Sequence, residues 1–524
     1  MGSSAMRLGR HQPAKPHQLA LLVCAYLIAR LDLLKHWDSP VFGWRPADIA
    51  SISLSYYRNG FHFIYPQVFW GGNGPGYVEM EFPIVPYWTG MLLELLGVHQ
   101  YVFVILPLLF GWGLVWLTYR FGSYFFDAGA GIAGALVVAV VPILTMLTIQ
   151  GGYADPPMVF FATLGLYLFV RWADDGHWAR LACGITCVAL AALIKLTGLY
   201  IGVPILYLMW RKDGASTWRS AVLWLTGAGV LIPVVLWYWH AHRLFVEYHN
   251  TFGILGAGYL KFGTASILTS AAFYLRTAYR FGLYHLTPFG SLGFLVGLEL
   301  SRRRRLTFVF VWLLSVALYV LVAAGGIAIG HFHYLMPLLP VCAMVAGAGL
   351  QEIFLRLLAF AGHGGRVLAG VALCVLLLAF AANTAYASNA FVTRDRGGDW
   401  PRWQQKKATG ERLARLARPN ALILVVDDDM DAWPPEKSMT PPEVFYFADR
   451  RGWYLSLAWL DQQKLEQRRR DGAQYFVVSA QSSANFRSKR PDLLAYLQHN
   501  YRTILDDGDG LAFDLTERPS ALSN

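Results

Sequence analysis

Charged residues are scarce in this chain of 524 residues: Asp, Glu, Lys and Arg together make up 15% of it. A soluble domain has about one quarter, whereas hydrophobic residues here reach 56%. The apolar residues also gather in uncharged runs, most of them close to the roughly 20 residues that a helix needs to cross a bilayer. Four such runs cover residues 130–149, 221–239, 308–328 and 367–382. The composition argues against a soluble all-α protein, which would have to bury every run.

Cysteine is also rare, with five residues in the chain, and none lies after residue 390. That part of the chain therefore neither needs nor reports a disulfide. Cys183 and Cys187 have the i, i+4 spacing of a helix, but no His, Asp or Glu lies near them in their apolar run. Two small buried residues are a better interpretation of this pair than a metal site.

Nucleotide-binding glycine motifs of the P-loop or dinucleotide kind are not seen either. The chain is basic, with 44 Lys and Arg against 33 Asp and Glu. These cations form short clusters between apolar runs, as in residues 302–305, instead of a patch interleaved with stacking aromatics. Such clusters are typical of cytoplasmic loops that follow the positive-inside rule, so no nucleic-acid partner is predicted.

Hydropathy predicts a polytopic α-helical membrane protein with about 11 transmembrane helices. They lie near residues 18–34, 101–120, 130–149, 156–172, 179–194, 197–211, 220–240, 286–300, 306–326, 333–351 and 367–386. The tail with Arg7, Arg10 and Lys15 should be cytoplasmic, and the basic loops at 211–219 and 301–305 then fall on the same side. An odd number of spans places the C-terminal part outside the cytoplasm.

The composition turns polar near residue 390. We therefore expect a transmembrane module over residues 1–389, with a first extracytoplasmic loop at about 35–100, and a soluble α/β domain over 390–524. Within the loop, Pro83–Leu96 is apolar on one face and should lie in the membrane interface. In the C-terminal domain, strand-like runs at 421–426, 475–479 and 511–515 alternate with helical stretches at 402–417, 442–451, 459–471 and 489–499.

Several acids are expected to face outside at the ends of apolar segments: Asp48, Glu79, Glu81 and Asp155. An acid close to a membrane is costly unless it has a role or a partner. Asp155 could simply cap a helix that begins with Pro156, and Asp48 could be a cap or a surface charge. A positioned carboxylate could instead take a proton from an acceptor hydroxyl while a second carboxylate orients the acceptor.

The order of the motifs resembles that of the GT-C glycosyltransferases, and most closely the protein O-mannosyltransferase and lipid A aminoarabinose transferase superfamily. The motifs are an acid soon after the first span, an aromatic and Gly-rich loop, an acid before Phe-Pro, Pro-x-x-x-Tyr-Trp at 83–88, and the stretches Gly152–Pro156, Gly330–Pro340 and Ala448–Trp453. The resemblance implies a GT-C-like fold. It also implies that Asp48 is the catalytic acid, Asp155 the second acid, and Glu81 the acid of a Glu-Lys-Pro motif.

The chain departs from that motif at Phe82, where the family's aminoarabinose branch has a Lys that would contact donor phosphate. Lys195, at the outer end of a predicted span, is the best replacement, although it could merely extend to the interface. Weaker candidates are the loop cations Arg58, Arg243, Lys261, Arg276 and Arg280. His331 and His333 bracket the late outer loop, where they could bind substrate or a metal or simply end a helix. Tyr77, Glu79 and Tyr334 complete the predicted substrate-binding set.

The resemblance predicts an inverting glycosyl transfer on the extracytoplasmic face of the inner membrane, with Asp48 as general base. The donor would be a sugar on a polyprenyl phosphate, and the acceptor a lipid, glycan or protein. No cofactor is predicted, although Asp48, Glu81 and the histidines leave a divalent metal open. Two alternatives are a transporter or flippase of a lipid-linked or envelope substrate, and a membrane partner protein that docks through its C-terminal domain.

Overall fold

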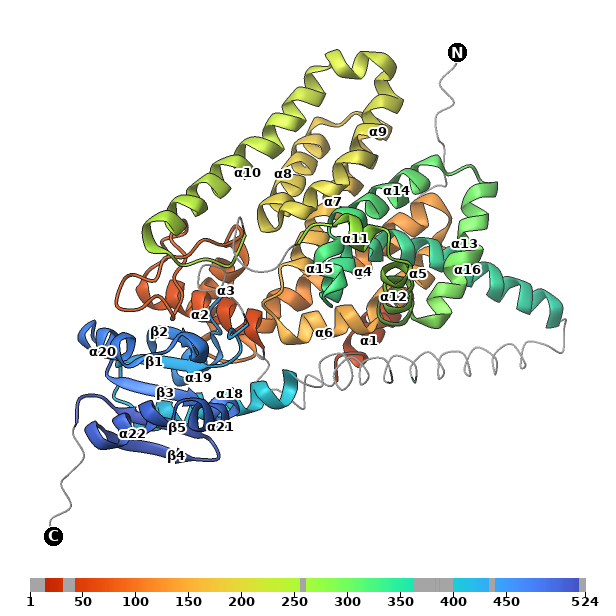
Figure 1. Cartoon of the computed structure of the whole chain (residues 1–524). Coiled ribbons are helices and arrows are strands. Elements are labelled where there is room, and N and C mark those ends of the chain that lie inside the picture. The colour runs from red at the N-terminus through yellow and green to blue at the C-terminus, as the bar shows by residue number, and fades with distance from the viewer. Residues whose placement is uncertain are drawn as a thin grey trace, which may run out of the picture. The chain divides into compact units, whose positions relative to one another are not determined.

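A computed structural model describes residues 15–31, 43–254, 261–361, 382, 386, 399–432 and 439–517. Its contacts divide the chain into two compact units, and their elements are labelled in Figure 1. The first, called here the helical unit, comprises Met1–Pro40, Val104–Trp237 and Leu260–Asp395. The second, called here the mixed unit, comprises Val41–Phe103, Tyr238–Tyr259 and Arg396–Asn524. The contacts divide the chain after Asp395, near the predicted boundary at residue 390. They also place Val41–Phe103 in the same unit as the C-terminal sheet.

The helical unit is built from apolar helices. In chain order they are α1 (Pro16–Ile28), α4 (Val102–Phe125), α5 (Ala128–Val140), α6 (Pro142–Gln150), α7 (Asp155–Asp175), α8 (Trp178–Ile194), η2 (Leu196–Ile201), α9 (Gly202–Asp213), η3 (Gly214–Arg219), α10 (Ala221–Tyr248), α11 (Ala265–Leu268), α12 (Ala271–Phe281), η4 (Gly282–Leu286), α13 (Thr287–Arg303), α14 (Thr307–Val322), α15 (Ala324–Ala328), η5 (Phe332–Leu338) and α16 (Leu339–Ala361). The first residues of α4 and the last of α10 belong to the mixed unit.

Within the described residues, five helical segments are long and apolar enough to cross a membrane, or six if the bent pair α5–α6 is one span. They coincide with six of the predicted spans. The spans expected at 18–34, 179–194 and 306–326 are the shorter apolar helices α1, α8 and α14. The span at 197–211 is the 3-10 helix η2 followed by α9, and the span at 367–386 lies almost wholly outside the described residues. The count of about 11 therefore stays a prediction.

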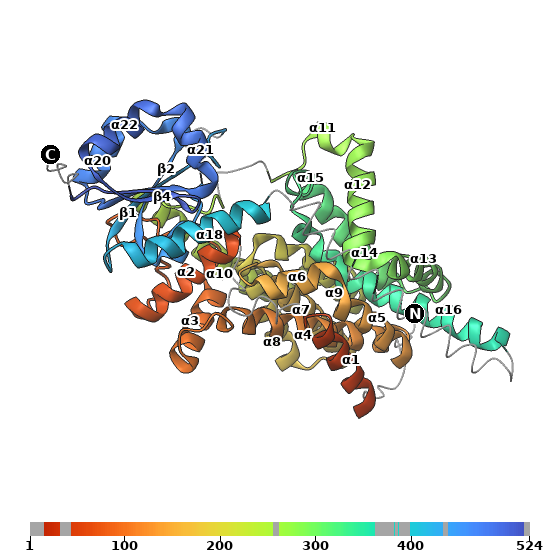
Figure 2. The same ribbon diagram turned by 90° about the horizontal axis from the view of Figure 1, so that it is seen from below.

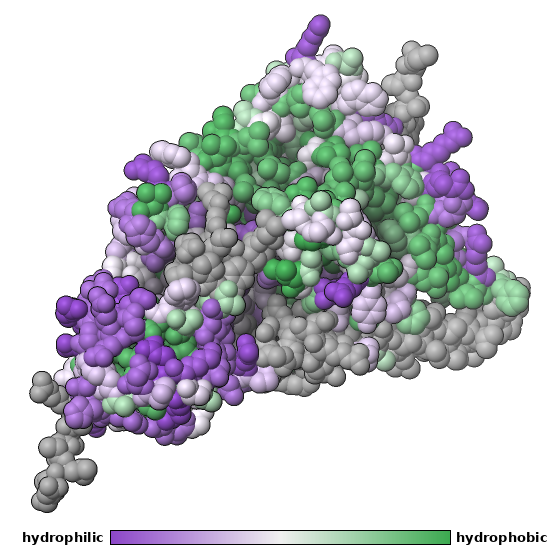
Figure 3. Space-filling model, viewed as in Figure 1, coloured by the Kyte–Doolittle hydropathy of each residue, from purple (hydrophilic) through white to green (hydrophobic). Residues whose placement is uncertain are grey.

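The exposed surface of these helices is apolar, as expected for contact with lipid. On α10 the side chains of Leu225, Ile232, Val235 and Leu236 are all more than half exposed. Figure 3 shows apolar residues gathered over α9, α10 and α14, whereas hydrophilic residues cover the C-terminal sheet. A water-soluble surface would not present such a continuous apolar face.

Glycine allows α13 and α16 to approach each other closely. A Cβ atom on Gly297 would lie 1.9 Å from the carbonyl oxygen of Val345, and one on Gly349 would lie 1.9 Å from that of Gly293. Helices in lipid commonly associate through small residues of this kind. The hydrophobic effect does not drive helices together in lipid, so close packing must hold them.

The mixed unit contains α2 (Trp44–Asn59), α3 (Ile84–Leu96) and a five-stranded sheet of order β2-β1-β3-β5-β4. The strands are β1 (Leu422–Asp427), β2 (Arg451–Ser456), β3 (Tyr475–Ser479), β4 (Arg502–Asp507) and β5 (Gly510–Asp514), of which β1, β2 and β3 are mutually parallel. Its other helices are α18 (Asp399–Leu416), α19 (Glu443–Ala448), η8 (Leu457–Trp459), α20 (Gln462–Arg470), α21 (Ala480–Lys489) and α22 (Pro491–Asn500).

The sheet lies between two layers of helices (Figure 2). Side chains alternate along β1: Leu424 and Val426 join one core with α20, α21 and α22, whereas Ile423 and Val425 join the other core. That second core also contains residues of α18, α19, α2 and α3. The early loop helices and the C-terminal sheet therefore share one hydrophobic core.

The predictions for the C-terminal part are confirmed for three strands: β1, β3 and β5. The sequence did not reveal β2, β4 or α21. The predicted helix at 442–451 is wrong over its last three residues, because Asp449 has the left-handed φ of 52° that ends α19, and β2 begins at Arg451. The signal for β2 is weak, since the strand depends on pairing with β1 and on hydrogen bonds to the early loop, a segment hundreds of residues away.

That pairing covers the exposed edge of the sheet. Strand β2 is an edge strand, and Gly452 on it donates to the carbonyl oxygen of Phe69 at 2.9 Å and accepts from the amide of Gly72 at 2.7 Å. An uncovered edge would present free backbone groups to other chains. The early loop is therefore held to the C-terminal sheet by main-chain hydrogen bonds.

Gly452→Ala is expected to destabilise the mixed unit by about 1–3 kcal/mol, the usual cost of overpacking a close contact. The reason is that a Cβ atom at Gly452 would lie 1.8 Å from the carbonyl oxygen of Ile423 on β1. Thermal denaturation monitored by circular dichroism measures this. Gly508→Ala is a matched control, since a Cβ there has no heavy atom within 4 Å; equal stability of both variants would contradict the prediction.

Candidate functional site

Two clusters of predicted site residues form, one in each unit. In the helical unit, Asp155 is the first residue of α7, where a carboxylate is favoured by the helix dipole. The chain reaches it through a turn at Gly151 and Gly152, both in the left-handed φ region at 67° and 71°, which glycine adopts without strain. The N-cap residue of α7 is Ala154. Asp155 therefore does not have the role of helix cap that the sequence analysis gave as an alternative.

Lys195 is the partner of Asp155. Its Nζ donates to Asp155 Oδ1 at 2.8 Å, and the two side chains are 13% and 2% exposed. Lys195 directly follows α8, and the chain then turns into η2, where Gly198 packs so closely on the end of α8 that a Cβ would lie 2.7 Å from Ala191. This turn directs the ammonium back towards the start of α7. Two predicted site residues 40 positions apart are thus brought into a buried ion pair.

The late motif contributes three further residues of this cluster, and Tyr153 completes it. The Nε2 atom of His333 lies 3.9 Å from Asp155 Oδ2, and the Lys195 Nζ lies 3.9 Å from the centre of the Tyr334 ring. His331 stacks on Tyr334, and Tyr153 contacts the ring of His333. We call the set Asp155, Lys195, His331, His333, Tyr334 and Tyr153 the lysine cluster. Its cation is held by an acid on one side and an aromatic face on another.

The second cluster lies in the mixed unit around Asp48, in the second turn of α2. Asp48 is 1% exposed and accepts a hydrogen bond from Trp70 Nε1 at 2.9 Å. Burial raises the pKa of this carboxyl well above the ordinary value, although the Trp70 hydrogen bond and the charge of Arg45 oppose the shift. Asp48 is therefore neither a cap nor a surface charge, and its environment makes it a stronger base than an ordinary aspartate.

Arg45, three residues before Asp48, is the cation of this cluster, and the sequence analysis did not select it. Its guanidinium pairs with Glu81 and lies over the Phe252 ring, 4.5 Å from the ring centre. Phe82, which departs from the family's motif, packs its ring against Phe63 instead. The sequence does carry one signal for Arg45: it stands three residues before Asp48, a spacing that places both side chains on the same face of a helix.

The remaining predicted residues lie around this second cluster or beyond it. Glu79 is buried, accepts a hydrogen bond from Thr251 and lies 3.9 Å from His242. Tyr77 packs between Tyr65 and Tyr248. Arg58 pairs with Asp449 in the C-terminal part at 2.6 Å, both side chains being about half exposed.

Two of the weaker cations contact aromatic rings: Arg243 lies over Trp239, and Arg280 lies over Phe332. For a divalent metal, the part of the chain that the structure describes has no group of three or more His, Cys, Asp or Glu side chains arranged to hold one.

The comparisons with known proteins agree with the predicted family resemblance. Residues 81–239 match the model of the family described as dolichyl-phosphate-mannose-protein mannosyltransferase. The Bacillus subtilis (strain 168) protein YycA, provisionally named a mannosyltransferase, is 29% identical over 41% of this chain, and the rice STT3B subunit of dolichyl-diphosphooligosaccharide–protein glycosyltransferase is 28% identical over 31%. The chain matches only 31% and 23% of the length of these two relatives.

Two solved structures share the fold of nearly the whole chain. ArnT from Cupriavidus metallidurans, bound to undecaprenyl phosphate, has a TM-score of 0.61 and 12% identity, covering 95% of this chain and 98% of that one. The oligosaccharyltransferase of Archaeoglobus fulgidus has a TM-score of 0.57 and 12% identity, covering 93% and 73%. The chain therefore has the GT-C glycosyltransferase fold, as predicted, within an integral membrane protein.

Proposed function

We propose that this protein is an inverting membrane glycosyltransferase that takes a sugar from a polyprenyl-phosphate donor and transfers it to an acceptor hydroxyl outside the cytoplasm. The observation that carries the proposal is the lysine cluster: a cation fixed by Asp155 and Tyr334 beside apolar helices. Such a cation suits the phosphate of a lipid whose chain lies in the bilayer. The ArnT structure, which holds undecaprenyl phosphate, supports the same class of donor.

In the proposed reaction, Asp48 removes the proton of the acceptor hydroxyl as that oxygen attacks the anomeric carbon. The bond between the anomeric carbon and the phosphate oxygen breaks, and the polyprenyl phosphate leaves with the electron pair. Lys195 stabilises the negative charge that develops on this leaving phosphate. Asp155 keeps Lys195 in place, and the histidines of the late motif contact the sugar or the phosphate.

In the proposed topology, the protein lies in the inner membrane with its N-terminus in the cytoplasm. Both clusters and the C-terminal domain lie on the extracytoplasmic side. The positive-inside distribution of loop cations supports this orientation. The acceptor is a lipid, a glycan or a protein, and the aromatic residues of the early loop, such as Tyr65 and Tyr77, provide rings on which sugars can stack.

The test is to incubate the purified protein in nanodiscs with radiolabelled polyprenyl-phosphate sugars and candidate acceptors. We expect one donor to raise the melting temperature and to release free polyprenyl phosphate together with a glycosylated product of inverted anomeric configuration. Movement of the labelled lipid between leaflets with no change in its chemistry would instead support a flippase. Retention of configuration would overturn the single-displacement mechanism.

A further inference from the structure

We propose that Glu443, in the C-terminal part of the chain, is a positioning residue of the Asp48 site, and that the buried Lys406 holds its carboxylate. Neither residue was selected from the sequence. The inference rests on the proposed function, since it takes Asp48 as the general base. It gives the C-terminal domain a direct part in the reaction rather than a separate docking role.

The geometry begins with the packing of α19 on α2. Val444 and Phe445 of α19 belong to the same buried core as Ala47 and Ile49, the neighbours of Asp48. At its far end, α19 is followed by Asp449, which pairs with Arg58 in the last turn of α2. Helix α19 therefore packs against α2 within the mixed unit, and the residue that follows α19 lies at the last turn of α2.

Both carboxyls are shielded from water. Glu443 is 6% exposed and Asp48 is 1% exposed. Charges in such an environment interact strongly, because neither water nor salt screens them. Glu443 is one of the charges that raise the pKa of Asp48.

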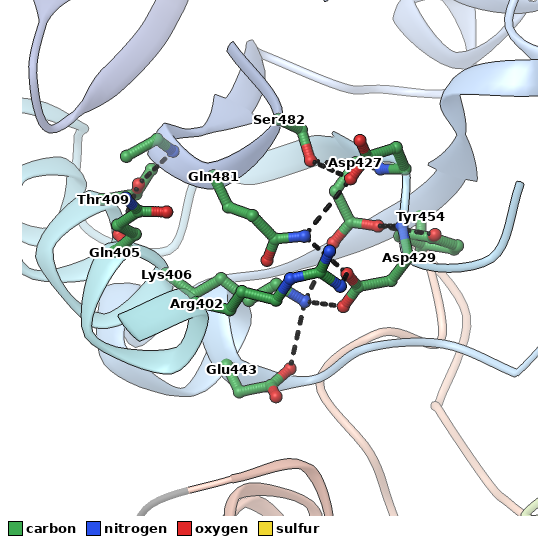
Figure 4. Close-up of polar contacts among 12 residues, drawn as sticks. Arg402, Gln405, Lys406, Thr409, Asp427, Asp429, Glu443, Tyr454, Gln481 and Ser482 are labelled. Atoms are coloured by element: carbon green, nitrogen blue, oxygen red, sulfur yellow. Dashed lines mark hydrogen bonds and ion pairs between the residues drawn. The ribbon is translucent and has the colours of Figure 1, made fainter. Parts of the chain in front are cut away.

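Lys406, on α18, anchors Glu443 within a buried network (Figure 4). Its Nζ lies 3.2 Å from Asp427 Oδ2 and 3.8 Å from Glu443 Oε2, and it also donates to Asp429. Asp427 accepts a further hydrogen bond from Tyr454, and Asp429 accepts one from Gln481. Among the described residues, neither Glu443 Oε2 nor Asp427 Oδ2 accepts a hydrogen bond, but Asp427 accepts one from Tyr454 on its other oxygen.

One buried ammonium is thus shared by three carboxylates. Burial disfavours the charge of Lys406, but the three acids outweigh this and raise its pKa. Burial also raises the pKa of Glu443, against the opposing charge of Lys406 and with added repulsion from Asp429 and Asp427. Lys406 is therefore the cation that favours the ionised form of Glu443, against burial and two neighbouring acids.

Charged groups reach Asp48 from three elements. Arg45 on α2 favours its ionised form, whereas Glu81 from the early loop and Glu443 from α19 disfavour it. The C-terminal domain thus contributes to the raised pKa of Asp48 and hence to its strength as a base. A purely structural Glu443 would hold α19 in place without changing how Asp48 titrates.

The experiment follows the titration of Asp48 through Trp70, which donates to its carboxylate. The protein is labelled with 5-fluorotryptophan, and the Trp70 resonance among 19 tryptophans is identified by its loss in Trp70→Phe. Its chemical shift is followed by fluorine NMR against pH. The shift should titrate in the unmodified protein and should no longer do so in Asp48→Asn.

In Glu443→Gln, we expect the midpoint of this titration to fall by about half a pH unit or more, because a negative charge near Asp48 is removed. Glu443→Asp keeps the charge and should restore most of the shift. Glu411→Gln is the control, since Glu411 is a half-exposed carboxyl of the same domain paired with Lys407. An unchanged midpoint in Glu443→Gln, or an equal displacement in Glu443→Asp, would overturn the proposal.

If Glu443→Gln does not fold, Glu443→Leu replaces it, because an apolar side chain of similar volume needs no polar partner when buried, and Lys406 keeps Asp427 and Asp429 as partners. The same fall in the midpoint is expected. The result is separate from the proposed function: a midpoint that falls while Asp48→Asn retains full transfer would reject Asp48 as the base, not its coupling to Glu443.

Discussion

Replacing Asp48 with Asn is expected to lower the rate of glycosyl transfer by about 10²–10⁴-fold, the range by which a general base accelerates a reaction. Asn preserves the shape of the side chain and can still accept the hydrogen bond from Trp70, but it cannot take a proton. The measurement is kcat at saturating donor, with product quantified by mass spectrometry. Asp461→Asn is the matched control, because Asp461 caps α20 and Asn caps helices equally well.

A pH profile of the unmodified enzyme sharpens this prediction. A base must be ionised to work, so kcat/KM should fall as the pH drops through the pKa of Asp48. Because burial raises that pKa, the fall should come well above the pH of about 4 at which an ordinary aspartate titrates. Transfer by Asp48→Asn at the wild-type rate would reject the base.

Removing Lys195 is expected to have the second large effect. Lys195→Ala should weaken donor binding strongly, because the donor phosphate loses its cation. It should also destabilise the helical unit by about 3–5 kcal/mol, because the buried Asp155 carboxylate loses the ammonium that pairs with it. Thermal denaturation gives the stability, and its shift on adding the lipid-linked sugar gives the donor affinity.

The two effects can be separated by a second substitution. In Lys195→Ala/Asp155→Asn the buried carboxylate charge is gone as well, so stability should largely return while donor binding stays weak. Lys212→Ala is the control, since Lys212 also lies over an aromatic ring, that of Trp172, but outside the lysine cluster. Donor affinity that survives in Lys195→Ala would end the assignment of Lys195 as the phosphate cation.

Sequence reasoning selected Asp48, Asp155 and Lys195 because each is a charged side chain at the end of an apolar segment, and His333 and Tyr334 because their stretch resembles a late motif of the family. Features of this kind are local and visible along the chain. What the sequence could not show is which of these residues meet. Lys195 was expected to bind phosphate, and its ion pair with Asp155 depends on a turn at Gly198 that no pattern of hydropathy encodes.

The residues that were missed, Arg45, Trp70, Lys406 and Glu443, have a different character. Each looks ordinary in its own segment, and each becomes important only through a partner distant in the chain or on a neighbouring turn. Lys406 and Glu443 read as surface charges of two polar helices, yet tertiary packing buries both. Likewise β2 was not predicted, because its pairing with β1 and with the early loop is non-local.

The sequence alone determined that the chain enters a membrane, that a sheet domain follows the apolar helices, and which acids stand at the segment ends. Hydrophobic runs and strand alternation are local properties, so the amino-acid order suffices for them. Tertiary structure alone decided that the early loop and the C-terminal sheet share one core, and that Asp48 and Glu443 are buried in the same unit. Burial and charge pairing depend on which segments pack together, and these segments lie almost four hundred residues apart.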